Sequence, residues 1–190
     1  GTDLTVEALA EATCAIPAKT LSFACDSKCG DSVPCRLTST AASTTCTYTC
    51  YAEAYQSPSF IFLIPFASST KASLTSPDGS TSVYASVSND DLTNVTTMSL
   101  KSTVDRVYIV GGSVYNQFIH GTMVNVTLAS DLLTLQPKVM WITFCSLNLQ
   151  PMINKLATML PLQATGIVLI NGGLGQFPSG FEKFTALRQL

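Results

Sequence analysis

The chain has 190 residues, a length at which one continuous domain with a sizeable core is expected. Ten basic and twelve acidic side chains give a net charge of -2, and no basic run is present, so nucleic acid is not an expected partner. Only 12% of the residues are charged, whereas 45 are Ser or Thr. The longest apolar run, residues 60–66, is too short to span a bilayer and contains Pro65, so no membrane insertion by this segment is expected.

Cysteines are concentrated at the start of the sequence. Six of the seven lie in the first fifty residues: Cys14, Cys25, Cys29, Cys35, Cys46 and Cys50. This even cluster predicts three disulfides formed in an oxidising compartment, with a connectivity that the sequence leaves open. Zinc binding is the less favoured alternative. Residues 45–51 alternate as a strand does, which would place Cys46 and Cys50 about 13 Å apart, too far to share one ion.

Two sequons for N-linked glycosylation, at Asn94 and Asn125, agree with the cysteine pattern. Together these signals predict an extracellular or secreted protein, or the ectodomain of a membrane protein. No signal peptide is present and the chain opens with Gly1, so we expect a processed or excised piece of a longer protein.

The organisation before residue 104 is expected to be β-rich. Residues 1–55 form a cysteine-rich head, and residues 56–103 form a β-rich cap or hairpin region. Within the latter, residues 60–66 are a candidate buried strand. A turn sequence at 76–79 precedes alternating apolar residues at 83, 85 and 87, which predicts a hairpin.

Residues 104–190 contain a degenerate repeat. Three segments start at 104, 139 and 164, and a fourth opens at 187. Counting the first residue of each segment as offset 1, the three carry apolar residues at offsets 1, 4, 6 and 11, with Ala164 at offset 1 of the third. The starts are 35, 25 and 23 residues apart, so the first repeat contains an insertion. Offsets 4 and 6 would point into a core from a short strand, whereas the offsets between them would lie on an exposed parallel sheet.

This pattern resembles the leucine-rich-repeat template L-x-x-L-x-L-x-x-N-x-L. The resemblance implies a mainly β fold with α/β repeats, in which a disulfide-rich β N-terminal cap leads into a leucine-rich-repeat solenoid. Such ectodomains occur in secreted repeat proteins and receptor-like kinases, and a kinase could follow Leu190, although no kinase motif occurs here. The sequence departs from the family at offset 9, where Gly112, Leu147 and Gly172 replace the usual asparagine.

The exposed offsets of these repeats predict a face that binds a protein or peptide. Its members are Arg106, Tyr108, Val110, Trp141, Thr143, Val168 and Ile170. Trp, Tyr and Arg are the residue types most enriched at binding hot spots. Cys145 would lie on the same face as a reduced, structural cysteine. A register shifted by one residue would instead place Trp141 in the core.

No enzymatic activity or cofactor is expected of this segment. The only histidine, His120, has no clear acidic partner, and the adjacent carboxylates Asp90 and Asp91 would point apart in a solvated turn. The alternative function is a secreted carbohydrate-binding or carbohydrate-active parallel β-helix. An enzyme of that kind would normally gather several acids on one exposed sheet, whereas the predicted face has only Asp105 beside it.

Overall fold

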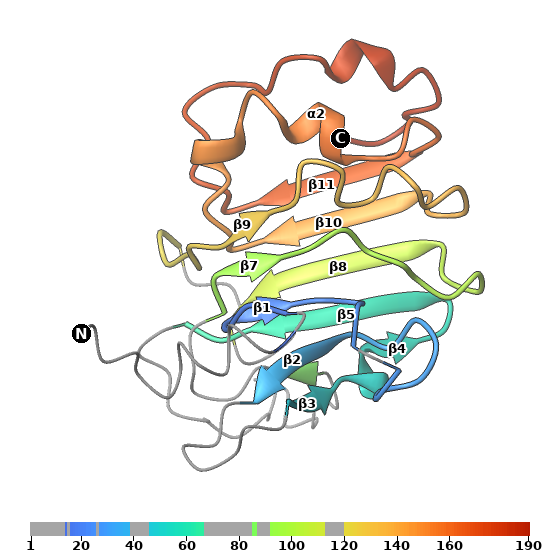
Figure 1. Ribbon diagram of the computed structural model, residues 1–190. Helices are drawn as coiled ribbons and strands as arrows, with labels where there is room; N and C mark the ends of the chain where they lie inside the picture. Colours follow the sequence, from blue (N-terminus) through green and yellow to red (C-terminus); the bar gives the residue numbers. More distant parts are fainter. Residues whose placement is uncertain are drawn as a thin grey trace, which may run out of the picture.

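The computed structural model describes residues 14, 16–25, 27–38, 46–66, 85–86, 92–112 and 120–190. Its largest element, called the main sheet, contains four long parallel strands that lie side by side in chain order (Figure 1). These are β5 (Ser59–Ile64), β8 (Arg106–Gly111), β10 (Trp141–Cys145) and β11 (Gly166–Ile170). The short strand β4 (Tyr55–Gln56) pairs with β5 in antiparallel orientation at the sheet edge.

The strand register of β8, β10 and β11 is the predicted one. Trp141 is paired with both Arg106 and Gly166, and the pairing continues residue by residue along the strands. Side chains alternate between the two faces, so offsets 4 and 6 enter the core. Ile142 and Phe144 of β10 are both fully buried. A register shifted by one residue would bury Trp141, which remains half-buried.

The backbone repeats one hydrogen-bond motif at the start of every long strand. The carbonyl oxygen of the residue just before each strand accepts hydrogen bonds from two successive backbone amides of the following repeat, at distances from 2.8 to 3.4 Å. These acceptors are Pro58, Asp105, Met140 and Thr165. The first member shows that β5 is equivalent to the later strands. The sequence pattern missed it because Ser57 stands where the others carry an aliphatic residue or Ala.

The hairpin expected in residues 56–103 stays a prediction, but β5 is not one of its arms. Strand β6 (Ala85–Ser86) pairs with β5 in parallel, with Phe62 opposite Ala85, so these two strands cannot be the arms of a hairpin. The turn sequence at 76–79 lies outside the described residues. β5 instead belongs to the parallel main sheet, where its neighbour is β8.

A second sheet packs over one face of the main sheet. Its three short parallel strands are β1 (Thr20–Leu21), β7 (Asn94–Val95) and β9 (Thr127–Leu128). Figure 1 shows them in front of the main sheet. Leu21, Val95 and Leu128 are buried in the core between the sheets, whereas Asn94 and Thr127 are exposed. The later crossovers carry the short helices η2 (Gln150–Met152), α2 (Leu156–Met159) and η3 (Phe181–Lys183).

The N-terminal cysteine cluster forms three disulfides, as predicted. Strand β2 (Cys35–Thr38) pairs antiparallel with β3 (Thr47–Cys50), which leads into the helix η1 (Ala52–Ala54). The bridges are Cys14–Cys46, Cys25–Cys35 and Cys29–Cys50. Cys46 and Cys50 therefore bond to different partners. Three of these sulfurs lie within 4.8 Å of one another, but each belongs to a disulfide, which argues against the zinc alternative.

The structure therefore shows a mainly β protein with parallel sheets and three disulfides near its N-terminus. The disulfides indicate an oxidising environment, such as the extracellular space. Within the described part of the chain, no helix has the length and apolarity that a membrane span requires.

Candidate partner-binding face

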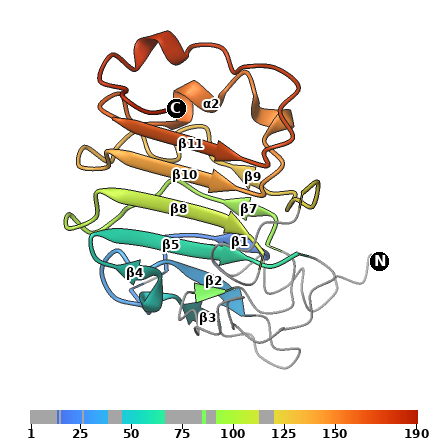
Figure 2. The same cartoon turned by 180° about the vertical axis from the view of Figure 1, so that it is seen from behind.

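The predicted face lies on the side of the main sheet turned away from the second sheet, here called the outer face. Within the described residues, no helix or strand covers β8, β10 and β11 on this side (Figure 2). Adjacent strands present Arg106 beside Trp141, Tyr108 beside Thr143, and Val110 beside Cys145. The geometry thus brings the predicted site residues onto one surface.

The exposure of these residues differs from the expected continuous patch. Arg106 and Ile170 are exposed, and Tyr108, Trp141 and Val168 are half-buried. Val110 is buried at 3% exposure, and it packs in a small apolar cluster with Ile61 and Leu63 of β5. Thr143 is also buried, at 8% exposure. The expectation that every non-core position is open is therefore wrong at Val110 and Thr143.

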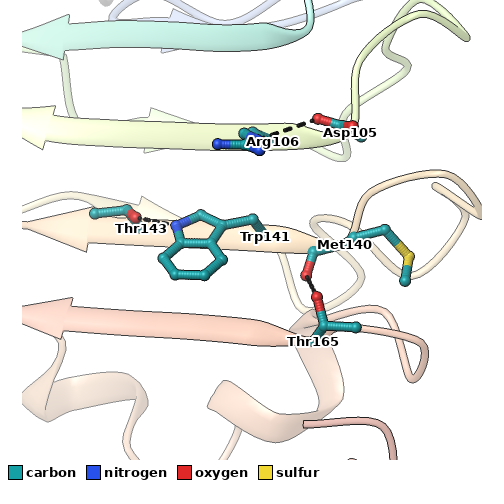
Figure 3. A network of polar contacts seen from close by, with 6 residues as sticks. All are labelled: Asp105, Arg106, Met140, Trp141, Thr143 and Thr165. Atoms are coloured by element: carbon teal, nitrogen blue, oxygen red, sulfur yellow. Dashed lines mark hydrogen bonds and ion pairs between the residues drawn. The ribbon is translucent and has the colours of Figure 1, made fainter. Parts of the chain in front are cut away.

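Thr143 is covered by its neighbour on the same strand. The indole Nε1 of Trp141 donates a hydrogen bond to Thr143 Oγ1 at 3.0 Å (Figure 3). The two residues are separated by one position on β10, so both side chains point to the outer face. This bond satisfies the polar end of the indole and fixes its direction along the strand.

Gly166 provides the surface on which the indole lies. A Cβ atom at this position would come within 2.2 Å of Trp141 Cε3 and 2.5 Å of Cζ3. Figure 3 shows the ring extending from β10 toward β11. Since a contact of that length is sterically forbidden, the ring position depends on the absence of a side chain on the neighbouring strand. Trp141 is therefore a preorganised aromatic group rather than a freely rotating one.

A charged pair borders this aromatic group. Arg106 Nε lies 3.5 Å from Asp105 Oδ1, and the two side chains are 54% and 50% exposed. An exposed pair of this kind contributes about 0–1 kcal/mol to stability, so it does not hold the guanidinium strongly. Met140 and Thr165 lie at the same end of the strands, where the Thr165 hydroxyl donates to the Met140 carbonyl at 3.2 Å. Because its pair with Asp105 is weak, Arg106 can offer its remaining donors to a carboxylate or carbonyl group of a partner.

The remaining predicted residues lie outside this group. Cys145 is the cysteine left over from the disulfides, and it sits half-buried at the margin of the Val110 cluster. Asn94 and Asn125 are exposed on the opposite side of the molecule, at the second sheet. His120 is exposed, and the pair Asp90 and Asp91 lies outside the described residues. The absence of enzymatic activity stays a prediction.

Sequence reasoning missed two features of the site. It placed Gly166 beside Trp141 but did not recognise the glycine as the seat of the indole, and it did not pair Trp141 with Thr143. A glycine opposite a lone tryptophan, inside an otherwise aliphatic strand, was the available signal. The chain matches no known family model, no curated protein and no solved structure.

Proposed function

We propose that this protein is an extracellular recognition module that binds a protein or peptide on the outer face of the main sheet. The observation that carries the proposal is the fixed indole of Trp141, seated on Gly166 between the exposed Arg106 and the aliphatic residues of β11. An immobilised aromatic side chain loses little conformational entropy on binding, which is a property of hot-spot residues.

The wider proposal is a leucine-rich-repeat solenoid with a disulfide cap, of the kind found in secreted repeat proteins and receptor-like kinase ectodomains. The shared register of β8, β10 and β11 and the repeated carbonyl motif support it. The missing asparagine at offset 9 of the third repeat has a neighbouring substitute. Asn171, one position earlier, donates from Nδ2 to Thr122 O at 2.9 Å and to Ser146 Oγ at 3.1 Å, so it links successive turns.

The chemistry of the face favours an extended peptide segment with an acidic and an apolar residue. Arg106 would donate hydrogen bonds to the carboxylate, while the indole of Trp141 and the side chains of Val168 and Ile170 would contact apolar groups. Ile170 is 41% exposed, although it is large and aliphatic. Burial of such a side chain on binding is favourable because it removes apolar surface from water.

Selection from a displayed library of random extended peptides tests this function. Selected peptides should bind the wild-type protein and lose at least tenfold in affinity for Trp141→Ala and for Arg106→Ala. The matched control is Lys155→Ala, which removes an exposed cation from the crossover after η2. Equal affinities for all three variants would show that binding occurs elsewhere. If none of the selected peptides competed with another for binding to the protein, they would bind at different places. That result would argue against a single binding face.

The second candidate is a carbohydrate-binding domain with a parallel β-helix fold. The second parallel sheet favours this alternative, because stacked coils with strands on two sides are what a β-helix provides. An indole held flat on a glycine could also contact the apolar face of a sugar ring. Two results together would favour this candidate. The wild-type protein should bind to a glycan array and Trp141→Ala should not, and the peptide selection should yield no ligand.

A further inference from the structure

The two glycosylation sequons, which are far apart in the sequence, come together on the second sheet. Asn94 of β7 is the direct register partner of Thr127 of β9, and Thr127 completes the sequon that begins at Asn125. From strand spacings, the two asparagines lie about 8 Å apart. No other Asn-x-Ser/Thr sequence occurs in the chain.

Both asparagines point away from the core. Exposed and buried residues alternate along residues 125–128, with Asn125 and Thr127 exposed and Val126 and Leu128 buried. Asn94 is likewise exposed, while its neighbour Val95 is buried. The second sheet and the main sheet enclose the core from opposite sides (Figures 1 and 2), so the exposed side chains of the second sheet face away from the outer face.

The side-chain amide of Asn125 is held in a way that leaves its nitrogen available. Asn148 Nδ2 donates to Asn125 Oδ1 at 2.9 Å, which fixes the carbonyl end of the amide. Among the described residues, none accepts a hydrogen bond from Asn125 Nδ2. This nitrogen is the atom to which an N-linked sugar is joined, so a glycan there would not displace a contact in the described part of the chain.

A groove adjoins the Asn125 side chain. Its volume is about 560 Å³, which is within the range of ligand sites. Its lining includes the polar residues Thr127, Ser130 and Lys155 and the apolar side chains of Met152 and Met159. A sugar ring has both hydroxyl groups and an apolar face, and this lining offers hydrogen-bond partners and apolar contact together.

We propose that the second sheet is a glycan-bearing face, with N-linked glycans on Asn94 and Asn125, and that the first sugar on Asn125 lies in the groove beside β9. In each transfer the Asn Nδ2 loses one proton and bonds to the first sugar of a lipid-pyrophosphate-linked oligosaccharide, and the lipid pyrophosphate leaves. The disulfides indicate the oxidising route on which such glycans are attached. Carbohydrate would then cover the outside of the second sheet and leave the outer face of the main sheet uncovered. This proposal does not depend on what the outer face binds.

Secretion from a eukaryotic cell line tests the occupancy of the two sites. Removal of N-glycans by PNGase F should increase the electrophoretic mobility of the wild-type protein by an amount that corresponds to two glycans, where one step is the shift caused by one glycan. Asn94→Gln and Asn125→Gln should each remove one step, and the double variant should remove both. A protein with no glycan, or with only one, would overturn the proposal.

The seating of the Asn125 sugar is tested with a pair of variants that leave the Asn148–Asn125 hydrogen bond in place. Thr127→Ser retains the sequon and Thr127→Ala destroys it. After trimming with endoglycosidase H, which leaves the first sugar attached, the Ser variant should melt about 2–4 °C higher than the Ala variant. The same pair made in the bacterial periplasm, without glycans, should melt together. Equal melting temperatures for the trimmed glycosylated pair would refute the seating.

Discussion

Replacement of Gly166 by Ala tests whether Trp141 is fixed on the neighbouring strand. The new methyl group would lie 2.2 Å from indole Cε3 and 2.8 Å from Cδ2, so the ring must move. Overpacking of this kind costs about 1–3 kcal/mol, and loss of the Trp141–Thr143 hydrogen bond adds about 0.5–1.5 kcal/mol. The reduced freedom of the unfolded chain offsets about 0.4–1 kcal/mol. We expect a net loss of about 2 kcal/mol and a melting temperature about 4–8 °C lower.

The assay follows from the composition of the chain. Trp141 is its only tryptophan, so intrinsic tryptophan fluorescence during urea unfolding reports both stability and the environment of this ring. The matched control is Gly166→Ala in a Trp141→Ala background, where the methyl group meets no indole; because that background has no tryptophan, its urea unfolding is followed by far-UV circular dichroism. There we expect a neutral effect or a gain of about 0.4–1 kcal/mol. Equal destabilisation in both backgrounds would refute the contact, because the cost could not come from Trp141.

Three further predictions concern the core, the cap and the cysteines. Phe144→Ala should destabilise by about 3–5 kcal/mol in urea unfolding, and more than Trp141→Ala, because Phe144 is fully buried; the reverse order would contradict the assigned faces of β10. Burial raises the pKa of Tyr55 from 10.0 to about 12, partly opposed by a backbone hydrogen bond. Tyr55 ionises first in the unfolded chain, so the melting temperature should fall as the pH rises from 10 to 12, and Tyr55→Phe should make this fall smaller. Thiol alkylation of the denatured, unreduced protein should label Cys145 alone, with peptide mapping recovering the bridges Cys14–Cys46, Cys25–Cys35 and Cys29–Cys50.

The strands of the main sheet could be predicted because periodicity and spacing both constrain them. Apolar residues at offsets 4 and 6 recur in three segments, and a shift of one residue would turn polar side chains into the core. The buried strand expected at residues 60–66 is confirmed by β5, but its place in the repeat escaped because Ser57 stands at the equivalent first position, where the template needs an apolar residue. The second sheet escaped for another reason. Strands of two residues, such as β7 and β9, are too short to carry a detectable period.

The candidate face shows what a periodic pattern cannot determine. Alternation assigns Val110 and Thr143 to the side away from the core, and the structure agrees. Whether such a residue is exposed depends on the size of its neighbours on the same face. Thr143 is buried because the indole of Trp141 lies over it, and Val110 is buried among Ile61 and Leu63 of a strand that the template did not include.

The same dependence on neighbours links the fold to the proposed function. Gly166 has no side chain, so β11 leaves room for the indole of Trp141, while the exposed pair Asp105 and Arg106 lies at the start of β8 on the other side. The indole of Trp141 is thus held between Gly166 and the guanidinium of Arg106, where the strands start. Aliphatic side chains fill the same face where the strands end. Recognition by this face would therefore be strongest at the strand starts. A ligand that contacted only the Val110 end would meet surface that the protein has already buried.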